Sequence, residues 1–185
     1  LKTQEARDVR HCVENPAKAT TRRVDVEMRQ VVEAVSGSKL RDNVNIHQSP
    51  AADLNSIING LNDHAPRIVH FSGHGYSGGL AVDHAKVQRP HGKVVTFDLL
   101  GKAFRSVDSP PDVVVLNACE SAGARKALLP SAKALIVMND SISDVAATAF
   151  AAKFYAAIAS GQSLQSAFKQ GQLAIEAASI NEVNI

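Results

Sequence analysis

The stretch DVVVLNACESAG, residues 112–123, decides the fold class of this 185-residue chain. It opens with three consecutive valines and a leucine, a pattern typical of a strand buried on both faces of a parallel sheet. The run at residues 134–138 is of the same kind, and residues 67–71 predict a further strand. These three runs predict strands of a mostly parallel sheet, each followed by a more polar loop.

The rest of the chain alternates between strand and helix patterns. Thr96 is expected to cap a helix over 97–107, and Ser49-Pro50 is expected to supply the N-cap and first-turn proline of a helix over 54–61. The other predicted elements are strands at 9–13 and 44–46, a hairpin of 80–82 with 93–95, a helix over 24–35 closed by Gly37, and alanine-rich helices after Ser143 and Ser163. This order predicts an α/β fold with helices on both faces of the sheet and right-handed crossovers.

Composition favours one globular domain over residues 1–185, since 45% of the residues are hydrophobic and no boundary is evident. The net charge is +2 with scattered basic residues, so we expect no nucleic-acid or membrane partner. Two cysteines form no disulfide framework, and no signal peptide or membrane span is recognised, which predicts a cytoplasmic protein. The first residue is Leu, so we expect a fragment of a larger protein or complex.

The glycine-rich stretch HFSGHGYSGG, residues 70–79, allows two interpretations. Gly73, Gly75 and Gly78 spell G-x-G-x-x-G after an apolar run, as in a dinucleotide-binding loop. That loop requires a helix after its third glycine, whereas residues 79–83 resemble a short strand. We therefore expect no bound cofactor, and we expect Gly78 and Gly79 to form a turn into the following hairpin.

The second interpretation makes His74 one half of a catalytic pair with Cys119. Loops that follow parallel strands meet at one edge of a sheet, and these two residues follow the strands at 67–71 and 112–116. A thiol needs a nearby imidazole to become a thiolate at neutral pH, and a helix starting near Ser121 would help through its dipole. The amides of Gly75 and Cys119 are candidate oxyanion donors. One alternative is that Cys119 only fills the core. Another is a zinc site formed by His70, His74 and Cys119, although no fourth ligand is evident.

Four stretches in this order resemble the CHAT family of caspase-like cysteine peptidases, whose fold is shared with caspases, separase and gingipain. They are ENPAKATTRRVDVEMRQVVEAV at 14–35, PRIVHFSGHG at 66–75, VVVLNACESA at 113–122 and IVMNDSISDVAATAFAAKFYAAIASGQSLQSAFKQG at 136–171. The resemblance implies a three-layer sandwich in which His74 and Cys119 are catalytic and Gly75 holds the oxyanion. It also implies that the substrate is a protein or peptide. The resemblance further implies that the chain is a proteolytic effector of a bacterial regulatory or antiviral system, and that a sensor domain or subunit activates this effector. Cys12 and Val13 depart from the small apolar residues expected at the end of the first strand.

Several residues near the predicted groove have open roles. His70 is a candidate to support substrate binding, although a buried histidine bonded to backbone is the favoured alternative. Asp140 is a candidate to bind a basic substrate residue. Asp144 is expected to cap its own helix. Glu120 and Tyr76 border the groove and are candidates to shape substrate access. The alternative to a peptidase is a non-catalytic caspase-like module that binds a partner protein in the same groove.

Overall fold

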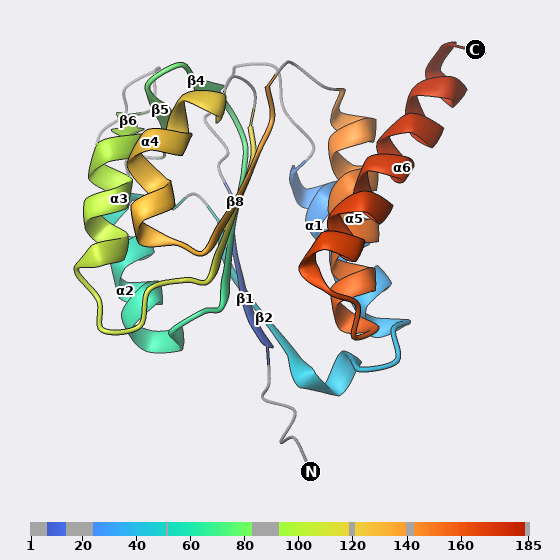
Figure 1. Cartoon of the computed structure of the whole chain (residues 1–185), viewed down its shortest axis with the longest axis horizontal. Helices are drawn as coiled ribbons and strands as arrows, with labels where there is room; N and C mark the ends of the chain where they lie inside the picture. The colour runs from blue at the N-terminus through green and yellow to red at the C-terminus, as the bar shows by residue number, and fades with distance from the viewer. Residues whose placement is uncertain are drawn as a thin grey trace. The chain divides into compact units, whose positions relative to one another are not determined.

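The computed structural model describes residues 7–13, 24–50, 52–82, 93–118, 121–139 and 143–183. Its main sheet, seen edge-on in Figure 1, has the strand order β2-β1-β3-β7-β8. The strands are β1 (Arg7–Val13), β2 (Val44–Pro50), β3 (Ile68–Ser72), β7 (Val113–Asn117) and β8 (Ala134–Val137). β3 pairs in parallel with both β1 and β7, and β7 pairs in parallel with β8. The predicted α/β class with a mostly parallel sheet is confirmed.

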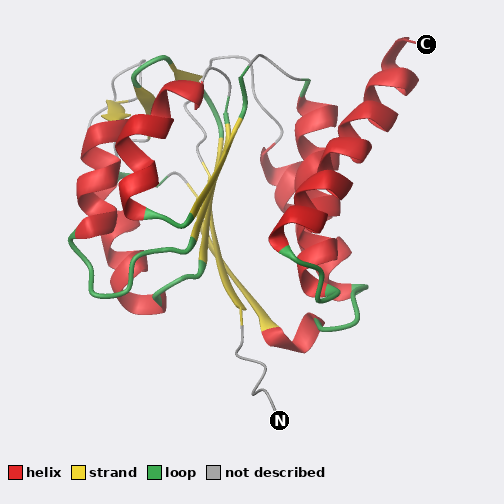
Figure 2. Cartoon of the chain, in the orientation of Figure 1, coloured by secondary structure: helices red, strands yellow, loops and turns green. Residues whose placement is uncertain are grey.

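β3 and β7 are the central strands of the sheet, and every residue in both is buried. Val69, Phe71, Val114 and Leu116 point to one face, where they join the apolar side chains of three helices. These helices are α2 (Leu54–His64), α3 (Phe97–Arg105) and α4 (Arg125–Leu128), shown in red in Figure 2. The runs of Val and Leu form strands here because both of their faces are removed from water.

A second, smaller sheet has the order β4-β5-β6, with β4 (Gly75–Tyr76), β5 (Gly79–Val82) and β6 (Lys93–Thr96) paired antiparallel. The predicted hairpin of β5 with β6 is confirmed. β4 was not predicted, because two residues are too few to show an alternating pattern. The prediction that β8 is buried on both faces is wrong, since three of its four residues are half-buried. β8 ends the order of the described sheet, so it has a strand neighbour on one side only.

One helix start and one helix cap differ from the prediction. Ser49 and Pro50 do not begin a helix, because β2 continues to Pro50 and the helix α2 is capped by Asp53. The Asp53 side chain accepts from the Ser56 amide at 2.7 Å while the Ser56 hydroxyl accepts from the Asp53 amide at 2.8 Å. The bond from the Ser56 amide, followed by a bond from the Ser56 side chain, lowers the pKa of the Asp53 carboxyl. In α5 (Asp144–Ala159) the cap is Ser143, which accepts from the Ala146 amide, and Asp144 is the first helical residue. Thr96 caps α3 as predicted.

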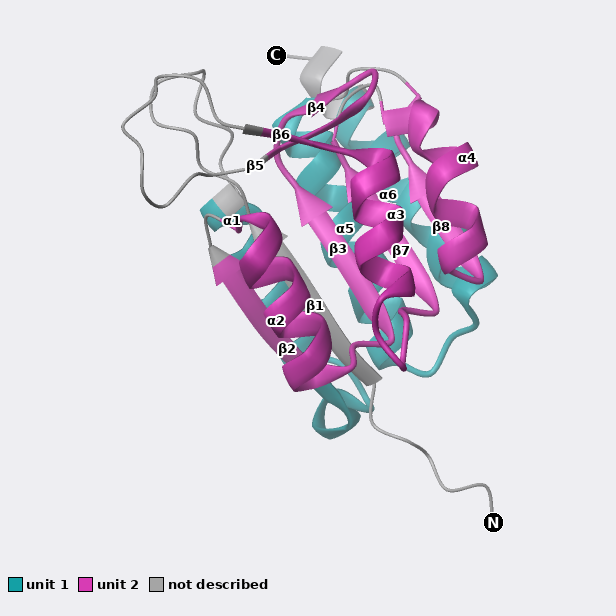
Figure 3. Ribbon diagram, turned by 90° about the vertical axis from the view of Figure 1, so that its left-hand side faces the viewer, with its two compact units in different colours: residues 1–6, 25–45, 142–185 teal, residues 7–24, 46–141 magenta. Residues whose placement is uncertain are grey.

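The described residues divide into two compact units, one within residues 7–13, 24, 46–50, 52–82, 93–118 and 121–139, and the other within residues 25–45 and 143–183 (Figure 3). The second unit contains α1 (Val24–Ser36), α5 and α6 (Leu164–Val183). Gly171 allows α5 and α6 to approach closely, because a Cβ atom there would lie 2.6 Å from the ring of Phe150. No helix in the described part of the chain is both long and apolar enough to cross a membrane. That residues 1–185 form one domain stays a prediction.

The amino ends of the central strands share one ion cluster. Asp112 accepts from the Lys133 ammonium at 2.7 Å and from the Arg67 guanidinium. These two bonds, the Lys133 bond first, hold the pKa of Asp112 below its ordinary value although burial opposes them. The folded state therefore binds a proton at Asp112 less readily than the unfolded state, whose carboxyl titrates near pH 3.9. The cluster stabilises the fold above about pH 4, and this contribution is lost as pH falls through the lowered pKa.

Replacing Asp112 by Asn is expected to lower the free energy of unfolding by about 1 kcal/mol at neutral pH. The loss is modest because the Lys133 and Arg67 side chains are largely exposed and screened by water. Urea denaturation of the unaltered chain and of Asp112→Asn, at about pH 7 and about pH 3, measures this loss. The difference in the free energy of unfolding between the two proteins should be smaller at the lower pH. A difference that grows on acidification would contradict this account of the cluster.

Candidate active site

The two predicted catalytic loops start from adjacent strand ends at the carboxyl edge of the main sheet. β3 and β7 pair in parallel up to Ser72 and Asn117, which lie opposite each other. His74 follows Ser72 by two residues and Cys119 follows Asn117 by two residues. The chain therefore leaves two adjacent strands at the same point, one strand leading to the predicted base and the other to the predicted nucleophile. Cys119 and Glu120 lie outside the described residues.

The loop of His74 begins with a backbone conformation that suits glycine. Gly73 has a φ of 154°, which side-chain-bearing residues rarely adopt. His74 is half-buried, and its carbonyl accepts from the Ala81 amide at 3.0 Å. Gly75 and Tyr76 then pair with Leu80 and Gly79 through a turn at Ser77 and Gly78. The predicted turn is confirmed at Gly78, whereas Gly79 is the first residue of β5. β5 occupies the place where a dinucleotide-binding loop would need a helix.

The amide of Gly75 points away from the hairpin. In an antiparallel ladder, residues of a non-hydrogen-bonded pair direct their N–H and C=O groups away from the partner strand. Gly75 and Leu80 form such a pair, because the bond that flanks them runs from the Ala81 amide to the His74 carbonyl. β4 is also an edge strand of the described small sheet. The Gly75 N–H is therefore directed to the open side of β4, as an oxyanion donor requires.

The segment after Cys119 is ordered by a residue that the sequence did not single out. Ser121 is completely buried, and its hydroxyl accepts from the Met138 amide at 3.0 Å. Its oxygen also lies 3.4 Å from the carbonyl oxygens of Leu116 and Met138. The expected helix near Ser121 is a 3₁₀ helix, η2 (Ser121–Ala124), that leads directly into α4. A serine between glutamate and alanine resembles a surface residue, so no local signal marks it as buried.

The other predicted site residues have different environments. His70 is completely buried in the middle of β3, opposite Val115 of β7. Tyr76 is 51% exposed in β4, next to Gly75. Asp140, like Glu120, lies outside the described residues. Cys12 lies in β1 opposite Phe71. Within the described ranges no three His, Cys, Asp or Glu residues are grouped to hold a metal ion, and the zinc hypothesis depends on Cys119, which those ranges omit.

Two comparisons with known proteins bear on this geometry. A search of curated proteins finds no match. A family model described as the CHAT domain matches residues 4–182, which is nearly the whole chain. This family is related to the caspase-like cysteine peptidases, and the match includes both His74 and Cys119. The chain therefore belongs to the CHAT-domain family.

Proposed function

We propose that this protein is a cysteine endopeptidase with a His74–Cys119 dyad. The observation that carries the proposal is the pairing of Ser72 with Asn117, which starts both loops from adjacent positions. This shared starting point supports a dyad in which the His74 imidazole and the Cys119 thiol act on one bound peptide. The half-buried His74 and the outward amide of Gly75 add the proton carrier and the oxyanion donor that acyl transfer needs.

The reaction follows from these groups. His74 takes the thiol proton, and the Cys119 sulfur attacks the scissile carbonyl carbon, moving its π electrons onto the oxygen. The amides of Gly75 and Cys119 donate to this oxyanion. The carbon–nitrogen bond then breaks, and His74 returns the proton to the leaving amine, which leaves a thioester on Cys119. Water, activated by His74, attacks the thioester and releases the acid product together with the free thiol.

We infer further that the substrate is a protein and that a sensor domain or subunit regulates the enzyme, as in a bacterial defence or signalling system. Membership of the CHAT-domain family supports this inference. The groove residues Asp140, Glu120 and Tyr76 are candidates to select the substrate residue before the cut, and a basic residue would suit the two carboxylates.

Labelling with a thiol-reactive peptide ketone tests the dyad. We expect the unaltered chain to gain one label on Cys119, and we expect Cys119→Ala and His74→Ala to gain essentially none. Cys12→Ala is the matched control because it removes the other thiol of the chain, and it should be labelled fully. Tryptic peptide masses locate the label. Labelling that persists in Cys119→Ala, or that resides on Cys12, would overturn the proposal and favour a non-catalytic binding module.

A further inference from the structure

We propose that η2 (Ser121–Ala124) is the positioning element of this site, because it contacts both the end of β8 and the hairpin that follows His74. The inference rests on the proposed function, since it assigns these residues a part in aligning His74 with Cys119. Neither Ser121 nor Gly123 is placed in contact with substrate, so they are positioning residues rather than catalytic ones.

The first contact ties the Cys119 loop to β8. Ser121 is the second residue after Cys119, and its hydroxyl accepts from the Met138 amide at 3.0 Å. The same hydroxyl can donate to the Leu116 or Met138 carbonyl, each 3.4 Å away. A hydroxyl that is completely buried is costly to leave without such bonds. The exit of the Cys119 loop is therefore held against the ends of β7 and β8.

The second contact ties η2 to the hairpin of His74. A Cβ atom on Gly123 would lie 2.7 Å from the carbonyl oxygen of Ser77, so the two backbones touch and leave no room for a side chain. Ser77 is in the turn between β4 and β5, three residues after His74. The next residue of the turn, Gly78, accepts from the Phe97 amide at 3.1 Å. The turn is therefore held by η2 and by the start of α3.

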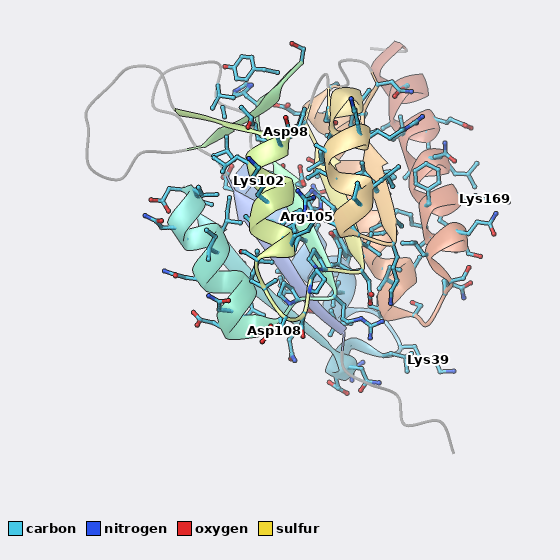
Figure 4. The ribbon with its side chains drawn as sticks, turned by 60° about the vertical axis from the view of Figure 1, so that its left-hand side comes forward. Lys39, Asp98, Lys102, Arg105, Asp108 and Lys169 are labelled. Atoms are coloured by element: carbon cyan, nitrogen blue, oxygen red, sulfur yellow. The ribbon has the colours of Figure 1, made fainter. Side chains whose placement is uncertain are left out.

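Contacts between α3 and α4 hold η2 in place. η2 continues into α4, and α4 packs closely on α3 at Gly101, where a Cβ atom would lie 2.6 Å from the Ala127 carbonyl oxygen. Arg105 of α3, labelled in Figure 4, bonds the Ser131 hydroxyl at 2.7 Å, and Ser131 donates to the Gly101 carbonyl at 3.3 Å. A shift of η2 would therefore move the hairpin or break these contacts.

Gly123→Ala tests the hairpin contact, and Gly78→Ala is its matched control. A Cβ atom at Gly78 meets nothing within 4 Å, although Gly78 lies in the same turn. We expect Gly123→Ala to speed hydrogen exchange at the Phe97 amide and to lower kcat/KM for a peptide about 10- to 100-fold, mainly through kcat, as a small misplacement of reacting groups does. Gly78→Ala should leave both measurements within about threefold of the unaltered chain.

Ser121→Ala tests the contact with β8, and Ser121→Thr keeps the hydroxyl. We expect Ser121→Ala to speed hydrogen exchange at the Met138 amide and to lower kcat. We expect Ser121→Thr to have an exchange rate and a kcat close to those of the unaltered chain. A purely structural serine would change stability without moving the pH dependence of the thiol. Iodoacetamide alkylation of Cys119 against pH, followed by peptide mass, is therefore the deciding measurement, and Ser121→Ala should move its midpoint toward the ordinary thiol value of about 8.5.

The outcomes separate this inference from the proposed function. If His74→Ala leaves the alkylation profile of Cys119 unchanged, the dyad is wrong and the positioning role falls with it. If the profile depends on His74 while Gly123→Ala and Ser121→Ala match the unaltered chain in kcat and alkylation, only the positioning role is overturned. A variant that does not fold is recognised by fast exchange over the whole chain. Exchange in the unaltered chain then decides: coupling of a peptide ketone to Cys119 should slow exchange at the Met138 and Phe97 amides, and unchanged exchange at both would overturn the positioning role.

Discussion

Replacing His74 by Ala is expected to lower kcat/KM for peptide cleavage by about 10²- to 10⁴-fold, the usual contribution of a positioned acid–base group. Without an imidazole, Cys119 becomes a thiolate only near its ordinary pKa of about 8.5. The remaining activity should therefore rise with pH through that value, whereas the unaltered chain should already be active at neutral pH. Hydrolysis of a fluorogenic peptide between about pH 5 and pH 10 measures both effects.

His64→Ala is the matched control for this experiment. His64 ends α2, shortly before β3 begins, so it lies at the amino end of the strand whose carboxyl end leads to His74. Its ring stacks on His47 at a centroid distance of 3.8 Å, outside the proposed site. We expect kcat/KM of His64→Ala to stay within about twofold of the unaltered value. A comparable loss in both variants would show that His74 matters only for folding.

Replacing Phe104 by Ala is expected to lower the free energy of unfolding by about 3–5 kcal/mol, the largest stability change that we predict. Phe104 is completely buried in α3, and its ring lies 6.5 Å from that of Phe71 in β3. The truncated side chain would leave a cavity between the helix and the sheet. Urea denaturation followed by circular dichroism measures the change.

Leu99→Ala is the control for the core prediction, because Leu99 lies in the same helix but is 39% exposed. We expect it to cost less than about 1 kcal/mol, since most of the cost of a core truncation comes from buried surface and the cavity. Equal losses in the two variants would contradict the assignment of Phe104 to the core between α3 and β3.

Local patterns predicted most of the secondary structure. Three consecutive valines and a leucine predict β7, and the hydroxyl of Thr96 predicts the start of α3, because strand burial and helix capping act over a few neighbouring residues. Where two local signals competed, the prediction failed. Ser49 and Pro50 resemble a helix start, but Asp53 and Ser56 satisfy each other's backbone amides a few residues later. Pro50 remains in β2.

Sequence patterns predicted less of the candidate site than of the strands. His74, Gly75 and Cys119 stand out by residue type and by their place after apolar runs. Ser121 and Gly123 do not, since their importance depends on what approaches them: the Met138 amide in one case and the Ser77 carbonyl in the other. Such contacts join residues far apart in the chain, and no periodicity within one segment reports them.

Sequence patterns alone predict the class of the fold, most of its strands and helices in their order, and the residue types available for a thiol-based reaction. Only the tertiary structure decided that Ser72 lies opposite Asn117, that the Gly75 amide faces away from its hairpin, and that η2 contacts the turn at Ser77. The physical reason is range. Propensity and capping act between neighbours in the chain, whereas register is set when whole strands are buried side by side, since a one-residue slip would turn every buried side chain to the opposite face.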